Sequence, residues 1–145
     1  GLRVEAETLA RLARGEVVLL DRFLLSTYAY QIHGRGLPEA PVRTGNQLAT
    51  AGLVPDLTIL LTLEPESGLA RAGARGGHDR IERADAAFHA RVADAFARFA
   101  EPEWQATHPE CGPIVAIDAS GSEDEVEARV RAVLAARLPD LGVAA

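Results

Sequence analysis

The sequence predicts an α/β fold in which a parallel sheet is covered by helices on both faces. Three short apolar runs, at residues 17–20, 57–63 and 114–117, have the length and composition of strands buried on both sides. Stretches with helical spacing of apolar residues separate these runs. Strands that alternate with helices along a chain usually form a parallel sheet, because each helix returns the chain to the same end of the sheet.

The helices are predicted from apolar spacing and from terminal signals. The first covers residues 1–14 and is terminated by Gly15. Others are expected at 26–31, 38–53 and 67–74, and a long one at 84–101 should bury a stripe formed by Phe88, Val92, Phe96 and Phe99. Ser122 and Glu125 form a capping-box pattern before a last amphipathic helix that stops at Pro139.

Composition restricts the class of protein. A chain of 145 residues, 48% hydrophobic and 25% charged, has the balance of one globular domain, residues 1–145. A net charge of −6 argues against a nucleic-acid partner. The chain shows neither an apolar run long enough to span a membrane nor the pattern of a signal peptide. A cytoplasmic protein is therefore expected, with the single Cys111 an inert packing residue.

Several kinds of chemistry find no support in the residues. The chain contains no lysine, so all 15 cationic side chains are arginine and Schiff-base chemistry is excluded. The four histidines lack the spacing of metal ligands and are expected at the surface, which predicts no metal site. No Gly-x-Ser-x-Gly motif for acyl transfer is present.

Two groups of charged residues are candidates for a binding site. Asp21 and Arg22 follow the first predicted strand, where the crevice at the carboxyl ends of parallel strands holds ligands. A second group lies in and around a glycine-rich loop and consists of Arg71, Arg75, Arg80 and Arg83. Two arginine sites would suit a substrate with several phosphates. A solvated, salt-bridged surface explains the same residues, and the pattern alone leaves both interpretations open.

Six segments together resemble the C-terminal two thirds of bacterial thymidylate kinases. They are "GEVVLLDRFLLSTYAYQ", "GRGLP", "GLVPDLTILLTLEPESGLAR", "ARGGHDRIER", "FHARVADAF" and "VAIDAS", in this order and spacing. The resemblance implies a P-loop nucleotide kinase fold with a five-stranded parallel sheet and a helix-mediated homodimer. It also implies transfer of the γ-phosphoryl group of ATP to thymidine 5′-monophosphate with Mg²⁺.

The resemblance implies roles for the acceptor site. Arg22 would bind the phosphate of thymidine monophosphate, and Asp21 would hold Arg22 or help to organise metal and water. Thr27 and Gln31 would hydrogen-bond the thymine edge. Tyr30 would pack by the deoxyribose, where its bulk disfavours a 2′-hydroxyl. Ser26 would hold the turn, and a structural role is as compatible with the pattern as a contact.

The resemblance also implies roles on the donor side. The segment from about 71 to 83 resembles the lid, in which Arg75 and Arg80 would reach the phosphates undergoing transfer and Glu82 would order the loop. Arg71 would flank the adenine of ATP. The stretch formed by Ala119, Ser120 and Gly121 would pass near the same ring.

Departures from the family pattern are also informative. Phe23 stands where tyrosine is more usual, and Ile32 and His33 replace a pair that commonly contains glycine. No Gly-x-x-x-x-Gly-Lys motif exists, so the first, central strand and the P-loop are expected to be absent from this chain. A gap is then expected between the strands at 17–20 and 57–63, left open, filled by another chain or closed up. The 145 residues alone are expected to be inactive, since most of the hold on ATP and Mg²⁺ would be missing.

Two alternatives remain. A nucleotide-binding module or pseudoenzyme would keep the acceptor and lid residues without transferring phosphate. A related nucleoside monophosphate kinase would act on another acceptor.

Overall fold

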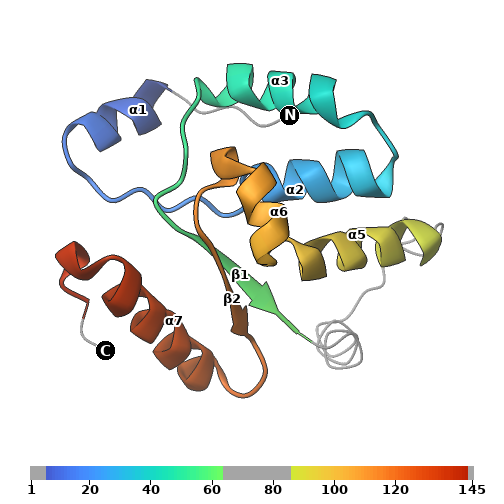
Figure 1. The fold of residues 1–145 in the computed structure, drawn as a ribbon. Coiled ribbons are helices and arrows are strands. Elements are labelled where there is room, and N and C mark those ends of the chain that lie inside the picture. Colours follow the sequence, from blue (N-terminus) through green and yellow to red (C-terminus); the bar gives the residue numbers. More distant parts are fainter. Residues whose placement is uncertain (1–5, 64–85, 144–145) are drawn as a thin grey trace.

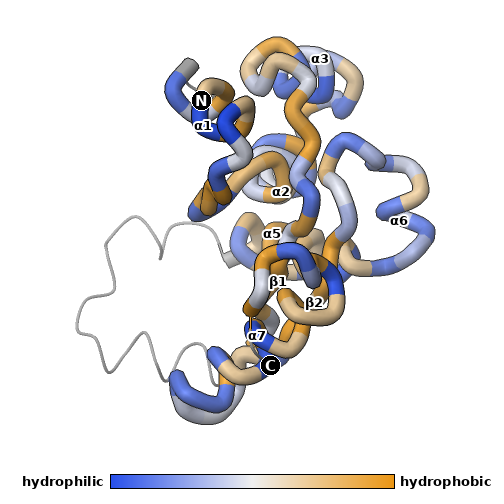
Figure 2. The backbone as a smooth tube through the Cα atoms, turned by 90° about the vertical axis from the view of Figure 1, so that its left-hand side faces the viewer, coloured by the Kyte–Doolittle hydropathy of each residue, from blue (hydrophilic) through white to orange (hydrophobic). Residues whose placement is uncertain are grey.

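The computed structural model describes residues 6–63 and 86–143, which form helices around a small sheet (Figure 1). Two strands lie in the middle of the molecule, and both contain hydrophobic stretches of the chain (Figure 2). The elements in chain order are α1 (Ala6–Ala13), α2 (Leu24–Thr27), the π-helix η1 (Tyr28–Gly34), α3 (Glu39–Thr50), β1 (Thr58–Thr62), α5 (Ala86–Arg98), α6 (Pro102–Thr107), the 3₁₀ turn η2 (Pro109–Cys111), β2 (Ile114–Asp118), α7 (Glu123–Arg137) and the 3₁₀ turn η3 (Pro139–Leu141).

The two strands are parallel and in register from end to end. Thr58 pairs with Ile114 and Thr62 with Asp118. A backbone hydrogen bond lies at each end of the ladder: Thr58 N–H donates to the Pro113 carbonyl (2.8 Å), and Ala119 N–H donates to the Thr62 carbonyl (2.7 Å). Two of the three predicted strands and their parallel orientation are thereby confirmed.

The strand predicted at residues 17–20 does not form. The segment has no regular secondary structure, and Val17 and Leu19 are 72% and 94% exposed. A strand is stabilised by hydrogen bonds to a neighbour, and the described sheet consists of β1 and β2 only. Apolar composition alone was therefore an insufficient basis for that prediction. Within the described residues the second edge of β1 also has no strand partner.

Helices cover the sheet from two sides. Ile114 and Ile117 of β2 are both buried, and the two-residue period of a strand directs them to opposite faces. Ile114 belongs to the core formed with α2, η1 and α5, whereas α7 packs against β2 from the other side (Figure 1). The predicted two-sided cover is present around this smaller sheet.

Most predicted helices are confirmed, with altered bounds. The helix predicted at 26–31 extends from Leu24 through η1 to Gly34, and α3 ends at Thr50 because Ala51 and Gly52 adopt positive φ angles (52° and 72°). The capping box of α7 forms as predicted: Ser122 Oγ accepts from Glu125 N–H (3.3 Å), and Glu125 Oε2 accepts from Ser122 N–H (2.7 Å). The predictions for 67–74 and for the lid at about 71–83 lie outside the described residues.

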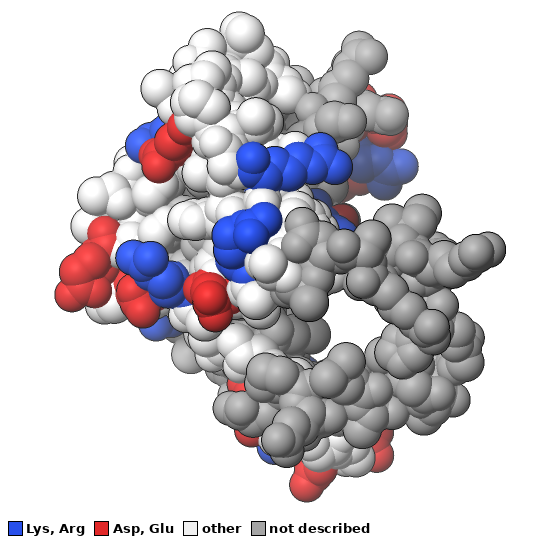
Figure 3. Space-filling model, turned by 90° about the vertical axis from the view of Figure 1, so that its right-hand side faces the viewer, with Lys and Arg blue, Asp and Glu red and all other residues white. Residues whose placement is uncertain are grey.

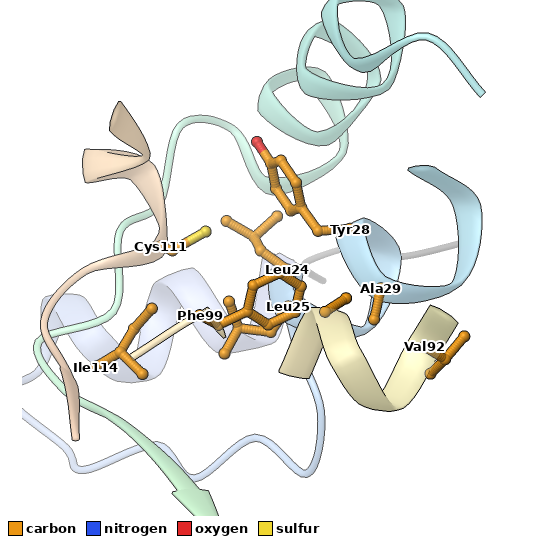
Figure 4. Packing of buried hydrophobic residues seen from close by; sticks show 9 residues of the cluster. Leu24, Leu25, Tyr28, Ala29, Val92, Phe99, Cys111 and Ile114 are labelled. Carbon is orange, nitrogen blue, oxygen red and sulfur yellow. The ribbon is translucent and has the colours of Figure 1, made fainter. Parts of the chain in front are cut away.

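The core gathers around an aromatic cluster on α5 and α6. The predicted stripe of α5 faces inward, with Val92 and Phe99 buried and Phe88 and Phe96 partly buried against them. Figure 4 shows the side chains that meet there from α2, η1, α5 and the segment leading into β2. The Phe99 ring lies 4.5 Å from the ring of Trp104, measured between centroids. Burial of this cluster fixes α2 and η1 on α5.

A partly buried polar network connects α3 to η1 and η2. The Tyr28 hydroxyl donates to Glu110 Oε1, and Arg43 Nη2 donates to Glu110 Oε2 (2.9 Å) and to the Thr107 carbonyl (3.2 Å). Burial opposes ionisation of Glu110, but these hydrogen bonds and the Arg43 charge outweigh it and lower the pKa of Glu110. Burial and the bond to Glu110 raise the pKa of Tyr28.

The prediction that all histidines lie at the surface is wrong for His108. Its ring is buried and stacked on Trp104, with centroids 3.8 Å apart and planes inclined by 4°. Its Nδ1 lies 2.8 Å from the Trp104 carbonyl, and its Nε2 lies 3.3 Å from Glu39 Oε1. The aromatic surface of a histidine packs well when both ring nitrogens have partners, and the spacing of histidines along the chain gives no sign of this. His33 is half-buried, His89 is exposed, and His78 lies outside the described residues.

The network makes stability depend on pH in the acid range. The folded pKa of Glu110 lies below its ordinary value of 4.5, so its stabilisation is complete above about pH 4.5 and is lost as the pH falls through the folded pKa. Glu110→Gln should lower stability at pH 7 and flatten the acid dependence, as measured by urea denaturation from pH 3 to 7. Asp94→Asn, an exposed substitution on α5, is the control. Equal acid dependence in the wild type and Glu110→Gln would contradict this role.

Gly112 provides a test of backbone packing. Its φ is +67°, and an added Cβ would lie 2.1 Å from the Pro55 carbonyl oxygen, a backbone atom that cannot move aside. Gly112→Ala should lower the free energy of unfolding by about 3 kcal/mol in denaturant titrations. Gly45→Ala, in the open middle of α3, should instead raise it by about 0.5 to 1 kcal/mol. Similar effects of the two substitutions would contradict the packing described here.

Candidate functional site

Asp21 and Arg22 lie at the bend between the extended segment and α2. Both side chains are exposed, and no ion pair joins them within the described residues. Arg22 has a φ of +66°, in the left-handed region that non-glycine residues rarely occupy. Its guanidinium carbon is 5.9 Å from the centroid of the Tyr30 ring. A strained backbone and a cation over an aromatic face present the guanidinium beside η1.

The other predicted acceptor residues share one side of the α2–η1 segment. The opposite side carries Leu24, Leu25, Tyr28 and Ala29, all buried in the core. Ser26 and Tyr30 are four residues apart, as are Thr27 and Gln31, and all four are half-buried. Residues at this spacing neighbour one another along a helix. The structure therefore brings together Arg22, Ser26, Thr27, Tyr30 and Gln31, which we call the acceptor face.

The acceptor face is built partly on a π-helix, which the sequence did not predict. Seven residues, Tyr28–Gly34, have this geometry. At its end, Gly36 has a φ of +71° and donates to the Ile32 carbonyl (2.8 Å), and Leu37 donates to the Gln31 carbonyl (3.0 Å). Widened helical turns are rare and occur frequently at functional sites. The glycine at 36 was a visible signal for the helix end, but no residue pattern indicated the wider turn.

Two further contacts orient side chains on this face. The Tyr30 ring lies 6.0 Å from that of Phe88 on α5, at an angle of 58°. Gln31 Oε1 accepts a hydrogen bond from Arg35 Nη1 (2.9 Å), so the carbonyl end of its amide is occupied. The NH₂ end of Gln31 then remains available to donate to a ligand. Sequence reasoning missed the contribution of Arg35.

The turn after β2 is a separate, tightly bonded structure. Ser120 donates to Asp118 from both its N–H (2.8 Å) and its Oγ (2.6 Å), which lowers the pKa of Asp118. Arg129 Nη1 donates to the carbonyls of Asp118 and Ser120 (2.8 and 2.7 Å). Ala119 is buried, whereas Ser120 and Gly121 are exposed. Of the predicted donor-side residues, these three lie together in one turn.

Other predicted site residues fall outside the described part of the chain. These are Arg71, Arg75, Arg80, Glu82 and Arg83. Over residues 6–63 and 86–143, no group of three metal-ligating side chains is present and no helix is long and apolar enough to cross a membrane. Cys111 is buried, and burial raises its pKa to about 12, which agrees with an inert thiol.

The chemistry of the acceptor face suits a small phosphorylated ligand. Arg22 offers a planar cation with parallel N–H donors, which matches phosphate oxygens. Hydroxyl and amide groups of Ser26, Thr27 and Gln31 offer both donors and acceptors. On the face drawn in Figure 3, acidic and basic side chains of the described residues are scattered among uncharged ones, unlike the continuous basic surface of a nucleic-acid-binding protein.

Comparison with known proteins agrees with this chemistry. The family model for thymidylate kinase matches residues 3–130. A thymidylate kinase of Synechococcus sp. is 49% identical over 128 residues, covering 88% of this chain and 57% of the relative. That of Deinococcus radiodurans is 44% identical over 126 residues, covering 87% and 58%. That of Trichodesmium erythraeum is 39% identical over 135 residues, covering 93% and 56%.

These matches cover nearly the whole chain but little more than half of each relative. The chain spans between 56% and 58% of the length of these three curated proteins. Identity of 39% to 49% over 126 to 135 residues, together with the family model, is sufficient to assign the family. The chain belongs to the thymidylate kinase family.

Proposed function

We propose that the protein to which this chain belongs transfers the γ-phosphoryl group of ATP to thymidine 5′-monophosphate, giving the diphosphate. The observation that carries the proposal is the acceptor face, where an exposed arginine lies beside Tyr30 and the hydroxyl and amide groups of a π-helical segment. Membership of the thymidylate kinase family supports the same reaction. We further propose that it works in the cytoplasm as a homodimer, without nucleic-acid or membrane partners.

Arg22 binds the acceptor phosphate in this proposal. Its side chain is exposed, and its one described contact is with the face of Tyr30, so its N–H donors remain available. A phosphate would accept two parallel hydrogen bonds from such a guanidinium. The neighbouring Asp21 either fixes Arg22 when substrate is bound or orders metal-bound water.

Recognition of thymine and deoxyribose falls to the helical part of the face. Gln31, whose amide oxygen is occupied by Arg35, would donate from its NH₂ group to a carbonyl oxygen of the base. Thr27 lies one turn earlier and would bond the same edge. Tyr30, held against Phe88, would pack by the sugar and leave little room for a 2′-hydroxyl. Ser26 would support the turn.

The proposed binding site for ATP rests on family membership and on the turn after β2. Ala119, Ser120 and Gly121 would pass along the adenine, with Arg71 flanking it. The hydrogen bonds from Arg129 give this turn a fixed shape suited to a flat ring. Arg75 and Arg80 would bind the phosphates undergoing transfer, where positioned cations stabilise the developing charge.

Magnesium does not fit the described residues. The acceptor face contains no carboxylate, Asp21 beside it supplies only one, and no described cluster offers the several oxygen ligands that Mg²⁺ requires. We infer that the metal, which would neutralise phosphate charge, is held by other parts of the longer enzyme, as are most contacts to ATP. The absence of lysine from these residues supports this, because a P-loop requires one. The same absence favours, as the second candidate, a nucleotide-binding module without transferase activity.

Arg22 can be tested in the full-length enzyme. Arg22→Ala should reduce kcat/KM for thymidine monophosphate by about 100-fold or more, because removal of one positioned donor commonly has this effect. Steady-state kinetics with a coupled assay would measure it. Arg131→Ala is the matched control, since Arg131 lies on α7 and pairs with Glu127 (2.6 Å). An Arg22→Ala enzyme with normal stability and unchanged kinetics would refute the assignment.

The proposal also predicts that a polypeptide of these 145 residues is inactive alone. Phosphoryl transfer depends on holding donor and acceptor in line, and the residues that grip the β- and γ-phosphates are expected outside this sequence. Purified 145-residue polypeptide, incubated with ATP, Mg²⁺ and thymidine monophosphate, should form no measurable diphosphate by chromatography. The full-length enzyme prepared in the same way is the control. ATP-dependent formation of thymidine diphosphate by the 145-residue polypeptide, free of host kinase, would contradict this prediction.

A further inference from the structure

Gly34 is the point where the π-helix meets α5. It is the last residue of η1 and is buried. A Cβ at this position would lie 2.5 Å from Phe88 Cε2 and 3.0 Å from Val92 Cγ2, both on α5. The two helices therefore approach closely only because residue 34 has no side chain.

The backbone carbonyl of Gly34 has no local donor. In a π-helix it would accept from the N–H five residues ahead, on Glu39, but within the described chain no such bond forms; four residues ahead stands Pro38, which has no N–H. The hydrogen bonds that end the helix go instead to the carbonyls of Gln31 and Ile32. A buried carbonyl left unpaired destabilises the fold, so Gly34 needs a partner from elsewhere in the molecule.

Arg91 supplies that partner. Its Nη2 and Nε both donate to the Gly34 carbonyl, at 2.8 and 3.2 Å. The end of a helix carries partial negative charge, so a cation there adds electrostatic stabilisation to the two hydrogen bonds. Phe88, Arg91 and Val92 are neighbours on one side of α5, and all three contact the turn between Tyr30 and Gly34.

We propose that Arg91 is a positioning residue for recognition of the thymidylate base and sugar. It does not reach the acceptor face; it fixes the end of the π-helix, and Tyr30 and Gln31 lie within the turn that is fixed. Loss of the bond would allow η1 to relax towards an ordinary helix, which would rotate both side chains relative to Arg22. The inference rests on the function proposed above.

The test compares variants of the full-length enzyme. Arg91→Gln should raise KM for thymidine monophosphate about tenfold and reduce its preference over uridine monophosphate, because charge-assisted hydrogen bonds are lost. KM for ATP should stay within about twofold, since the donor side does not depend on this turn. Arg91→Lys should recover part of the loss, as one donor is retained. Arg98→Gln, on the same helix and 65% exposed, is the control.

Opposite results are distinguishable. Unchanged KM and nucleotide preference in Arg91→Gln would overturn the inference, as would equal losses for both substrates with a lowered Tm, which mark a general structural defect. Isothermal titration of thymidine monophosphate against Arg91→Lys provides a second readout if Arg91→Gln folds poorly. If Arg22→Ala lowers kcat/KM while the Arg91 variants behave like the wild type, this inference is refuted and the proposed function is not. Lack of any effect of Arg22→Ala refutes the proposed function itself.

Discussion

The packing of the α2–η1 segment against the aromatic stripe of α5 is the contact on which the rest of the molecule depends. Tyr28, Ala29 and Leu25 are buried on one side of the segment. Because a helix has two sides, burial of these residues places Ser26, Thr27, Tyr30 and Gln31 together on the other side, where all four are half-buried. The same hydrophobic contact therefore stabilises the core and sets the geometry of the acceptor face. Substitutions in the core would be expected to alter ligand binding as well as stability.

The polar network around Glu110 connects α3 to this packed unit. Tyr28 takes part in both, since its ring lies in the aromatic cluster and its hydroxyl bonds Glu110. Arg43 then connects Glu110 to α3, and Glu39 at the start of α3 lies beside His108. Partly buried polar groups that are paired with one another favour one arrangement of the helices, because a shift would break these bonds. One tyrosine thus couples hydrophobic and polar parts of the core.

Periodicity predicted the elements that bury a continuous apolar face, and it failed where a neighbour decides the outcome. The core stripe of α5 could be assigned from sequence because its apolar residues, at helical spacing, lie on one face of the helix. It consists of Phe88, Val92, Phe96 and Phe99. Residues 17–20 have an equally apolar composition but no strand beside them in the described chain, and sequence carries no local sign of that. The contribution of Arg91 could not be predicted from sequence either, because it bonds the carbonyl of Gly34, 57 positions away along the chain. The acceptor residues are predicted from family resemblance and stay a prediction, whereas no residue pattern indicates the widened turn on which Tyr30 and Gln31 lie.

Over the residues that the structure describes, β1 is paired along one edge, and this affects how such a polypeptide behaves in solution. A strand bonded on one edge presents a row of N–H and C=O groups on the other, and such edges recruit further strands from any chain that reaches them. Leu61 of β1 is 55% exposed, and the exposed apolar stretch at 17–20 has the composition of a strand that could pair there. Two copies that pair through these segments would give assemblies that grow with concentration. Low concentrations and edge-blocking charges would keep the short chain monomeric.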